Sequence, residues 1–259
     1  MTRIAGIINL TPDSFYAGSR CIDAEAVRST ALKMRDEAAA MLDIGACSTR
    51  PGSTPASAAE ELQRLEAGIP VVREACPDIP LSVDTFRPEI AAQCISRWDV
   101  RVINDISGGN EAMYRTIADA GASYILTWSE PIRVDPLAEM VSFFKERIGI
   151  LHSYGVKDII IDPGFGFGKE LMQNYLILAN LGILRQFGLP IMAGLSRKSM
   201  ACKLLGIQPE QALEATVALN TLAASAGADW LRVHDVRSAV QAAAIAGAFT
   251  NSKDPQSKK

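Results

Sequence analysis

The sequence has few of the residues that build metal centres, disulfide frameworks or membrane spans. Its 259 residues include only two histidines and five cysteines, and no two cysteines form a C-x-x-C pair. An odd number of cysteines without such a pair favours neither a disulfide framework nor a zinc site, so we expect reduced thiols in a cytoplasmic protein. There is no apolar run of about 18 residues and no secretory signal at the start, so a membrane span is not expected.

A large excess of one charge is also missing. The formal net charge is −3, from 26 Lys and Arg against 29 Asp and Glu. Without a broad basic field, we expect no binding to nucleic acid or to an anionic membrane surface. An anionic small-molecule substrate would have to be held by local Arg and Lys side chains.

What the chain does have is a regular alternation of short β-branched runs and longer amphipathic runs. The predicted strands are Ile4–Ile8, Met41–Ile44, Pro80–Val83, Arg101–Asn104, Ser123–Thr127, Asp158–Ile161, Pro190–Ala193 and Trp230–Val233. The predicted helices are Ala24–Ala40, Ser57–Ala75, Pro88–Ser96, Glu111–Ala120, Pro136–Tyr154, Leu171–Phe187, Gln208–Ala226 and Ser238–Gly247. Eight such pairs predict a single-domain α/β fold, a (β/α)8 TIM barrel over residues 1–250, with a disordered polar tail over 251–259. A doubly wound sheet is the main competitor, because local periodicity does not distinguish a closed sheet from an open one.

Polar residues recur where the predicted strands end, and one, Asp43, lies within the second predicted strand. They are Asn9, Asp43, Asp84, Asn104, Asp105, Asp162, Ser196, Arg197, Lys198, Arg232, His234 and Asp235. The carboxyl ends of barrel strands meet at one face, where barrel enzymes place their chemistry, so the pattern predicts a catalytic rim. Helix capping could explain one or two of the Asp and Asn residues. It does not explain Lys198, Arg232 and His234.

The segments at these strand ends carry a recognisable set of motifs. They are GIINLTPDSF (6–15), DIGACSTRPG (43–52), SVDT (82–85), INDISGG (103–109), DPGFGFGK (162–169) and GLSRKS (194–199), followed by RVHD (232–235). In this order they resemble the signatures of the dihydropteroate synthase family over nearly the whole chain. The resemblance implies a barrel transferase of folate biosynthesis. Such an enzyme condenses 6-hydroxymethyl-7,8-dihydropterin diphosphate with 4-aminobenzoate to 7,8-dihydropteroate and pyrophosphate, using Mg²⁺.

The glycine-rich segment 162–169 has the spacing of neither a phosphate-binding P-loop nor a dinucleotide fingerprint. Asp162 can accept paired N–H bonds from a heterocycle, as a carboxylate does from a guanidinium. Asn104 can both donate and accept on the same edge, and Phe167 can cover one face of the ring. The resemblance assigns pterin recognition to Asp162, Asn104 and Lys198, with Asp84 near the same ring. The alternative is a plain turn in which Asp162 caps a helix.

A second group of residues fits a diphosphate. Arg232 and His234 alternate along a strand end, so their side chains point to the same side. With Arg50 and Asn9 they are expected to form a diphosphate cradle. The resemblance assigns Arg232 and His234 to pyrophosphate, Arg50 to a loop contact and Asn9 to Mg²⁺, which needs few protein ligands because it keeps waters and substrate phosphates. For His234, a purely structural role is the alternative.

The third expected subsite takes 4-aminobenzoate. Ser199 lies where a helix begins, and helix N-termini attract anions such as a carboxylate. The resemblance places Phe15, Thr49, Pro51, Lys198 and Ser199 in this pocket. It implies catalytic roles for Asp84, Lys198, Arg232 and His234. It also implies inhibition by sulfonamides and a homodimer formed through helices of the C-terminal half.

One stretch departs from the family pattern. Where the family usually carries a Leu-Met-His-Met-like run, this chain has Leu126-Thr-Trp-Ser129. Thr127 thus offers a hydroxyl where an apolar contact to the pterin is expected, and we expect Trp128 to restore a ring contact. Two other functions stay open: a pterin-dependent methyltransferase on a similar barrel, and a catalytically silent pterin-binding protein.

Overall fold

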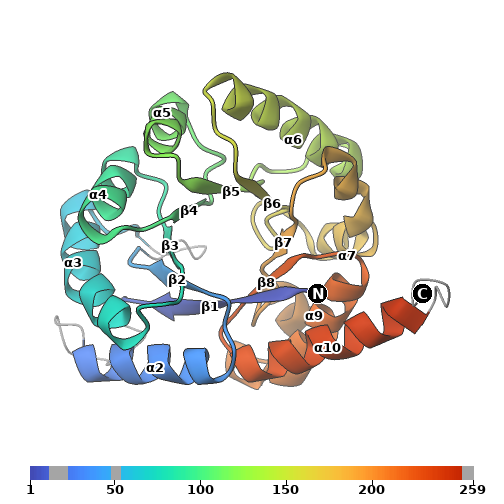
Figure 1. Cartoon of the computed structure of the whole chain (residues 1–259). Helices are drawn as coiled ribbons and strands as arrows, with labels where there is room; N and C mark the ends of the chain where they lie inside the picture. Colours follow the sequence, from blue (N-terminus) through green and yellow to red (C-terminus); the bar gives the residue numbers. More distant parts are fainter. Residues whose placement is uncertain (12–22, 48–53, 253–259) are drawn as a thin grey trace, which may run out of the picture.

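The computed structural model describes residues 1–11, 23–47 and 54–252. Eight parallel strands follow one another in the order β6-β5-β4-β3-β2-β1-β8-β7. A parallel bridge between Ile161 and Ile191 joins the two edges of this sheet. The strands therefore enclose a barrel with the helices around it, as Figure 1 shows. The predicted (β/α)8 fold is confirmed and the open doubly wound sheet is excluded.

The eight strands lie close to their predicted positions. They are β1 (Arg3–Asn9), β2 (Met41–Gly45), β3 (Leu81–Asp84), β4 (Val102–Asp105), β5 (Ser123–Thr127), β6 (Ile159–Asp162), β7 (Met192–Ala193) and β8 (Trp230–Val233). Their ends differ from the predictions by no more than two residues.

The helices follow the strands in turn. They are α2 (Ala24–Asp36), α3 (Ala58–Ala75), α4 (Pro88–Trp98), α5 (Glu111–Ala120), α6 (Pro136–Ser153), α7 (Leu171–Ala179), α8 (Ser199–Leu205), α9 (Leu213–Ser225) and α10 (Val236–Ser252), with 3-10 helices η1 (Leu181–Phe187) and η2 (Pro209–Gln211). The predicted capping box at the start of α3 is confirmed, because Ser57 and Glu60 each bind the other's backbone N–H.

Four helix predictions differ from the structure by more than two residues at one end. The helix predicted over 24–40 ends at Asp36. The helix predicted over 171–187 is divided into α7 and η1 at Asn180, whose side-chain amide donates to the carbonyl of Leu176 and ends the α-helix. The helix predicted from Gln208 begins only at Leu213, after η2. At the C-terminus α10 continues to Ser252, two residues into the expected tail, and residues 253–259 lie outside the described part.

The barrel interior changes character along its axis. Alternate residues of each strand point inward. Near the N-terminal ends of the strands the interior is filled by the apolar side chains of Ala5, Met41, Val102, Ile125, Met192 and Trp230. Two residues further along their strands, Met41, Val102 and Trp230 are followed by Asp43, Asn104 and Arg232. The apolar side chains fill the N-terminal half of the barrel interior, and the polar side chains form a layer above them at the C-terminal face.

The other row of strand residues points outward and packs against the helices. Leu42, Val83 and Leu231 are fully buried in this larger core. In the part of the chain that the structure describes, no helix combines the length and the apolar character needed to cross a membrane.

Candidate functional site

A network of four polar side chains from four strands forms the centre of the barrel. Asp43 of β2 accepts at Oδ2 from Asn104 Nδ2 of β4, at 3.1 Å, and from Arg232 Nε of β8. Arg232 also donates from Nη2 to Asp84 Oδ2 of β3, at 2.6 Å. The predicted pterin residues Asn104 and Asp84 and the predicted diphosphate residue Arg232 are therefore brought together. They are joined by Asp43, to which the sequence analysis assigned no role in binding or catalysis.

Asp43 is fully buried, and its second oxygen, Oδ1, has no hydrogen-bond partner among the described residues. A buried carboxylate is costly unless it is paired. Its pairing with Arg232 explains why it is tolerated. The signal for Asp43 was present in the sequence, because an Asp in the otherwise apolar strand Met-Leu-Asp-Ile-Gly falls on the same face as Met41, which points inward.

Burial and neighbouring charges shift the pKa values of this network. Burial raises the pKa of Asp84 to about 7, although Arg232 opposes the shift. Burial likewise raises the pKa of Asp162, against a hydrogen bond from Gly164 and the charge of Lys198. Burial and Arg232 lower the pKa of Lys198 to about 8. Both shifts bring the pKa values of Asp84 and Lys198 close to neutral pH. A ligand that supplies donors and negative charge would favour the ionised forms of both groups.

The glycine-rich segment after β6 lies against Lys198. Asp162 accepts at Oδ1 from the N–H of Gly164, at 2.7 Å. The ammonium of Lys198 lies 4.2 Å from the centre of the Phe167 ring. A Cβ on Gly166 would lie 3.3 Å from Cδ of Lys198, so only a glycine leaves that lysine its full space. The predicted grouping of Asp162, Phe167 and Lys198 is therefore present.

His234 follows β8 and is held by Ser196, which follows β7. Ser196 Oγ lies 3.0 Å from His234 Nδ1 and accepts from the backbone N–H of His234 at 3.2 Å. Because Ser196 Oγ accepts from that backbone N–H, its hydroxyl group can donate a hydrogen bond to Nδ1. In the neutral imidazole the ring proton is then on Nε2. Next to this pair, Arg197 forms a bidentate ion pair with Asp235.

Other predicted residues are placed differently or lie outside the described part of the chain. Asp105 does not join the network, because it points outward and accepts from Tyr124 and Ser107. Ser199 is the first residue of α8, as predicted, and Lys198 is its N-cap. The predicted residues Phe15, Thr49, Arg50 and Pro51 lie outside the described residues.

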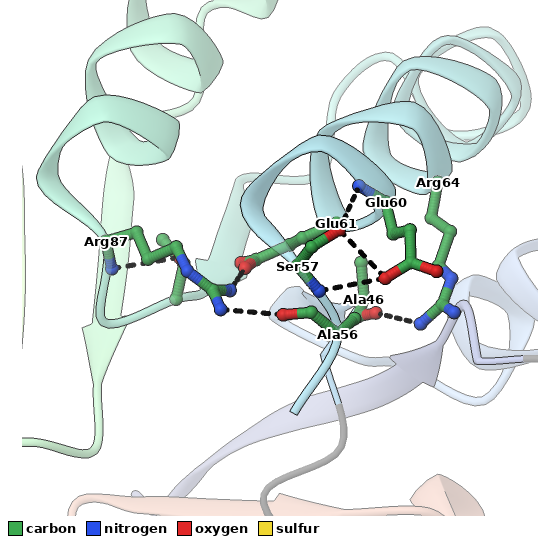
Figure 2. Close-up of polar contacts among 8 residues, drawn as sticks. Ala46, Ala56, Ser57, Glu60, Glu61, Arg64 and Arg87 are labelled. Atoms are coloured by element: carbon green, nitrogen blue, oxygen red, sulfur yellow. Dashed lines mark hydrogen bonds and ion pairs between the residues drawn. The ribbon is translucent and has the colours of Figure 1, made fainter. Parts of the chain in front are cut away.

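The two flanks of residues 48–53 are each held by an arginine, as Figure 2 shows. Arg64 of α3 donates to the carbonyl of Ala46, at 2.8 Å. Arg87, just before α4, donates to the carbonyl of Ala56, at 2.7 Å. Arg87 also forms an ion pair with Glu61, whose carboxylate is fully buried. These contacts fix the described ends of the segment beside β2 and β3, which carry Asp43 and Asp84.

Asn9 ends β1 opposite Gly45 in the sheet register. A Cβ on Gly45 would lie 3.5 Å from Asn9 Oδ1 and 3.7 Å from Asp84 Cβ, so the carboxamide of Asn9 and the side chain of Asp84 lie on the same side of β2. The described residues contain no group of three His, Cys, Asp or Glu that could hold a metal by themselves. A carboxamide oxygen suits Mg²⁺, which takes its other ligands from water and phosphate.

The comparisons with known proteins agree with this geometry. A family model described as "Pterin binding enzyme" matches residues 5–234. The chain is 36% identical to the dihydropteroate synthase of Escherichia coli K12, with 97% of this chain and 93% of that protein aligned. This chain belongs to the dihydropteroate synthase family.

Solved structures of the dihydropteroate synthase family have the same fold. The Xanthomonas albilineans enzyme, solved with 4-aminobenzoic acid, is 38% identical with a TM-score of 0.88, over 96% of this chain and 93% of that one. The Yersinia pestis enzyme, solved in a sulfonamide drug complex, is 34% identical with a TM-score of 0.88, over 96% and 94%.

The stretch that departs from the family pattern is fully described. Thr127 is opposite Asp162 in the sheet register and is buried. Trp128 is only 1% exposed, and its ring packs at 6.4 Å from that of Phe143 of α6. Successive strand residues point to opposite faces, so Trp128 faces the helices when Thr127 faces the barrel. In this dihydropteroate synthase family member, the ring contact expected from Trp128 is therefore not available in the barrel interior.

Proposed function

We propose that the chain is a dihydropteroate synthase, which joins 6-hydroxymethyl-7,8-dihydropterin diphosphate to 4-aminobenzoate and releases pyrophosphate. The observation that carries the proposal is the meeting of two kinds of group at one end of the barrel. Buried acceptors for a heterocycle, Asp162 and Asn104, lie in the same site as the cations Lys198 and Arg232. This combination fits a flat hydrogen-bonding ring attached to a diphosphate.

Asp162 and Asn104 would bind the pterin. The carboxylate of Asp162 accepts from the N–H groups of the pyrimidine edge, and Asn104 contributes an amide whose orientation Asp43 fixes. Lys198 would donate to the carbonyl or ring nitrogen, and Phe167 would cover one face of the ring. A site built on such hydrogen bonds rejects analogues that lack them, because its buried polar groups would be left unpaired.

The diphosphate would lie against Arg232, His234 and Asn9, with Arg50 as a further contact. Arg232 is held at Nε and Nη2 by Asp43 and Asp84, so its position is set before the substrate arrives. His234 would donate from Nε2 to a phosphate oxygen, since Ser196 occupies Nδ1. Asn9 would hold Mg²⁺, which adds positive charge to neutralise the leaving pyrophosphate.

Loss of pyrophosphate leaves positive charge on the pterin methylene carbon. Asp162 is buried and the side chain of Asp84 is 15% exposed. We propose that both carboxylates lie near this carbon and stabilise its charge, which favours an SN1-like substitution. The weakly basic amine of 4-aminobenzoate then attacks the carbon, and the nitrogen of the new C–N bond gives up a proton to water or to the released pyrophosphate. No strong general base is required, so positioning and electrostatics supply most of the catalysis.

The 4-aminobenzoate would bind next to Lys198 and Ser199, with Phe15, Thr49 and Pro51 as its other contacts. Because sulfonamides mimic 4-aminobenzoate, we propose that they inhibit this enzyme too.

We also propose a homodimer formed through α7, α8 and α9. These helices expose apolar side chains, among them Met172, Leu176, Leu204, Leu205 and Leu222. Exposed apolar side chains on neighbouring helices are typical of a protein interface. A cytoplasmic location is consistent with the buried free thiols of Cys76 and Cys94.

The proposed reaction is tested by measuring pyrophosphate release. A dihydropteroate synthase releases pyrophosphate only when the pterin diphosphate and 4-aminobenzoate are both present. Release without 4-aminobenzoate, or methyl transfer from methyltetrahydrofolate, would overturn the proposal. Binding of pterin without turnover would support the catalytically silent alternative.

A further inference from the structure

Lys169 ends the glycine-rich segment after β6, and its ammonium makes three hydrogen bonds. Nζ donates to the carbonyls of Trp128 at 2.8 Å, Gly164 at 3.0 Å and Phe167 at 3.0 Å. It also lies 4.2 Å from the centre of the Trp128 ring. Three carbonyl oxygens saturate the three donors of a lysine, so the group is fully engaged inside the protein.

Two of these carbonyls belong to residues that control the pterin subsite. The N–H of Gly164 donates to Asp162, and the carbonyl of the same residue accepts from Lys169. The peptide groups on both sides of Gly164 are therefore fixed, one by the carboxylate and one by the ammonium. The carbonyl of Phe167 is held in the same way, and its ring faces the ammonium of Lys198.

The backbone of the segment needs such an anchor. Gly164, Gly166 and Gly168 all have positive φ, at 66°, 84° and 58°. Glycine adopts this conformation without steric cost, but it loses more conformational freedom on folding than any other residue. At Gly164 a Cβ would come within 2.0 Å of the carbonyl oxygen of Trp128, the same oxygen that Lys169 binds. Lys169 thus ties the segment to the end of β5 at its point of closest approach.

Lys169 is placed to organise the subsite without contacting the ligand itself. Its nitrogen is directed at backbone carbonyls and at the Trp128 ring, and Trp128 is on the helix side of β5. Burial lowers the pKa of Lys169 to about 7, which indicates how strongly the surroundings exclude water. A buried lysine that contacts the ligand-binding segment only through carbonyl groups has the arrangement expected of a positioning residue.

We propose that Lys169 is a positioning residue that holds Asp162 and Phe167 in the geometry that binds pterin. This inference rests on the proposed function, because it assigns Asp162 and Phe167 to the pterin. It predicts that removing the donors at position 169 weakens pterin binding selectively. Pyrophosphate should be unaffected, since its proposed contacts, Arg232 and His234, are held by other residues.

The test compares Lys169→Met with wild type and with Lys157→Met. Methionine keeps the apolar stem against Trp128 but donates no hydrogen bonds. Lys157 is exposed in the short loop before the N-terminal end of β6, away from the glycine-rich segment, and serves as the matched control. Calorimetric titration with pteroic acid should give a dissociation constant roughly 10- to 100-fold larger for Lys169→Met, as expected for a displaced recognition group. The dissociation constant for inorganic pyrophosphate should be unchanged, and Lys157→Met should match wild type.

Lys169→Arg keeps a cation with several donors and should recover part of the pteroic acid affinity. If Lys169→Met does not fold, Lys169→Arg is compared with wild type in its place. Equal affinity for pteroic acid in folded Lys169→Met and wild type would overturn the inference while leaving the proposed function intact. Equal losses for pteroic acid and pyrophosphate would overturn it as well, because they would indicate general disruption. If wild type itself does not bind pteroic acid, the proposed function fails first.

Discussion

Asn104 donates a hydrogen bond from its amide nitrogen to Oδ2 of Asp43, 3.1 Å away in the barrel interior. A carboxylate is only an acceptor, so the amide nitrogen must be the atom that faces Asp43. The carbonyl oxygen and the second N–H of Asn104 are left for a ligand. Because the same oxygen of Asp43 binds Arg232, one buried carboxylate orients a proposed pterin contact and a proposed diphosphate contact together.

Asp43→Asn should lower kcat/KM for the pterin diphosphate by roughly 10- to 100-fold, as is common when a group that orients a binding residue is lost. The substitution keeps the shape of the side chain but removes its charge, so Arg232 has one ionic partner instead of two and Asn104 loses its strong acceptor. Initial rates with varied pterin diphosphate measure the effect. Asp36→Asn is the control, since Asp36 is 67% exposed in its pair with Arg35. Unchanged kinetics in Asp43→Asn would contradict this role.

Arg232→Ala should slow turnover more than it weakens binding of 4-aminobenzoate. The guanidinium is proposed to stabilise negative charge that develops on the leaving pyrophosphate, and loss of one such group costs roughly 10²- to 10³-fold in kcat. Single-turnover rates and equilibrium titration with 4-aminobenzoate separate the two effects. Arg237→Ala removes a 74% exposed arginine and should change neither. Equal losses in turnover and in 4-aminobenzoate binding would refute the assignment.

Asp162→Asn should nearly abolish pterin binding while the fold survives. The buried carboxylate would be replaced by an amide that presents a donor to the N–H groups of the pterin edge. Calorimetric titration with pteroic acid measures the affinity, and circular dichroism confirms the fold. An unchanged affinity would show that Asp162 does not bind the pterin.

The stability of the ligand-free protein should fall as the pH rises from the ordinary carboxyl pKa to about 7. Asp84 has its pKa raised to about 7 in the folded protein, so in this window the folded state keeps a proton that the unfolded chain has lost. Stability decreases with pH wherever the folded state binds more protons. Asp162 acts in the same direction.

Thermal midpoints measured across this pH window test the prediction. In Asp84→Asn the thermal midpoint should depend less on pH, because only the contribution of Asp162 remains. The control Asp119→Asn, at an exposed position, should give the same dependence of the thermal midpoint on pH as wild type. A midpoint that rises with pH in wild type would show that Arg232, rather than burial, dominates the protonation of Asp84.

Two ion pairs, one from α3 to the N-cap of α4 and one from α3 to α4 itself, offer a matched comparison of stability. Glu61 pairs with Arg87 with side-chain exposures of 0% and 17%, and Glu66 pairs with Arg97 with exposures of 41% and 46%. Glu61→Gln removes the buried carboxylate of the pair and leaves a partly buried guanidinium without its charge partner, which should cost up to about 3–5 kcal/mol. Glu66→Gln should cost no more than about 1 kcal/mol. Urea unfolding of both variants measures the loss in free energy of unfolding. Equal losses would mean that other groups stabilise the charge of Arg87 once Glu61 is replaced.

The strand positions were predictable because β-branched runs and turn residues alternate so regularly, and the positions of Asp84, Asn104, Asp162 and Arg232 followed from the strand ends. The sequence could not show the partners of these residues. Asp43 had the right strand position, but only the register of β2, β4 and β8 brings it to Asn104 and Arg232. Trp128 was expected at the ligand because the alternation of β5 had not been fixed. Lys169 ends the motif at 162–169, but no pattern in the sequence indicated its role, because a lysine that binds backbone carbonyls looks like an exposed one in sequence.

The two strands β6 and β7 are joined by fewer backbone pairings than any other neighbouring pair in the barrel. β7 has two residues, and one bridge, Ile161 to Ile191, closes the cylinder there. Asp162 follows directly on one side, and Gly194 lies on the other, where a Cβ would be 3.7 Å from Asp162 Oδ2. A pterin held by Asp162, which ends β6, and by Lys198, which follows β7, would connect these two strands. The amide of Ile161, which donates to Pro190 across the gap at 2.9 Å, should therefore exchange its hydrogen more slowly once the site is filled.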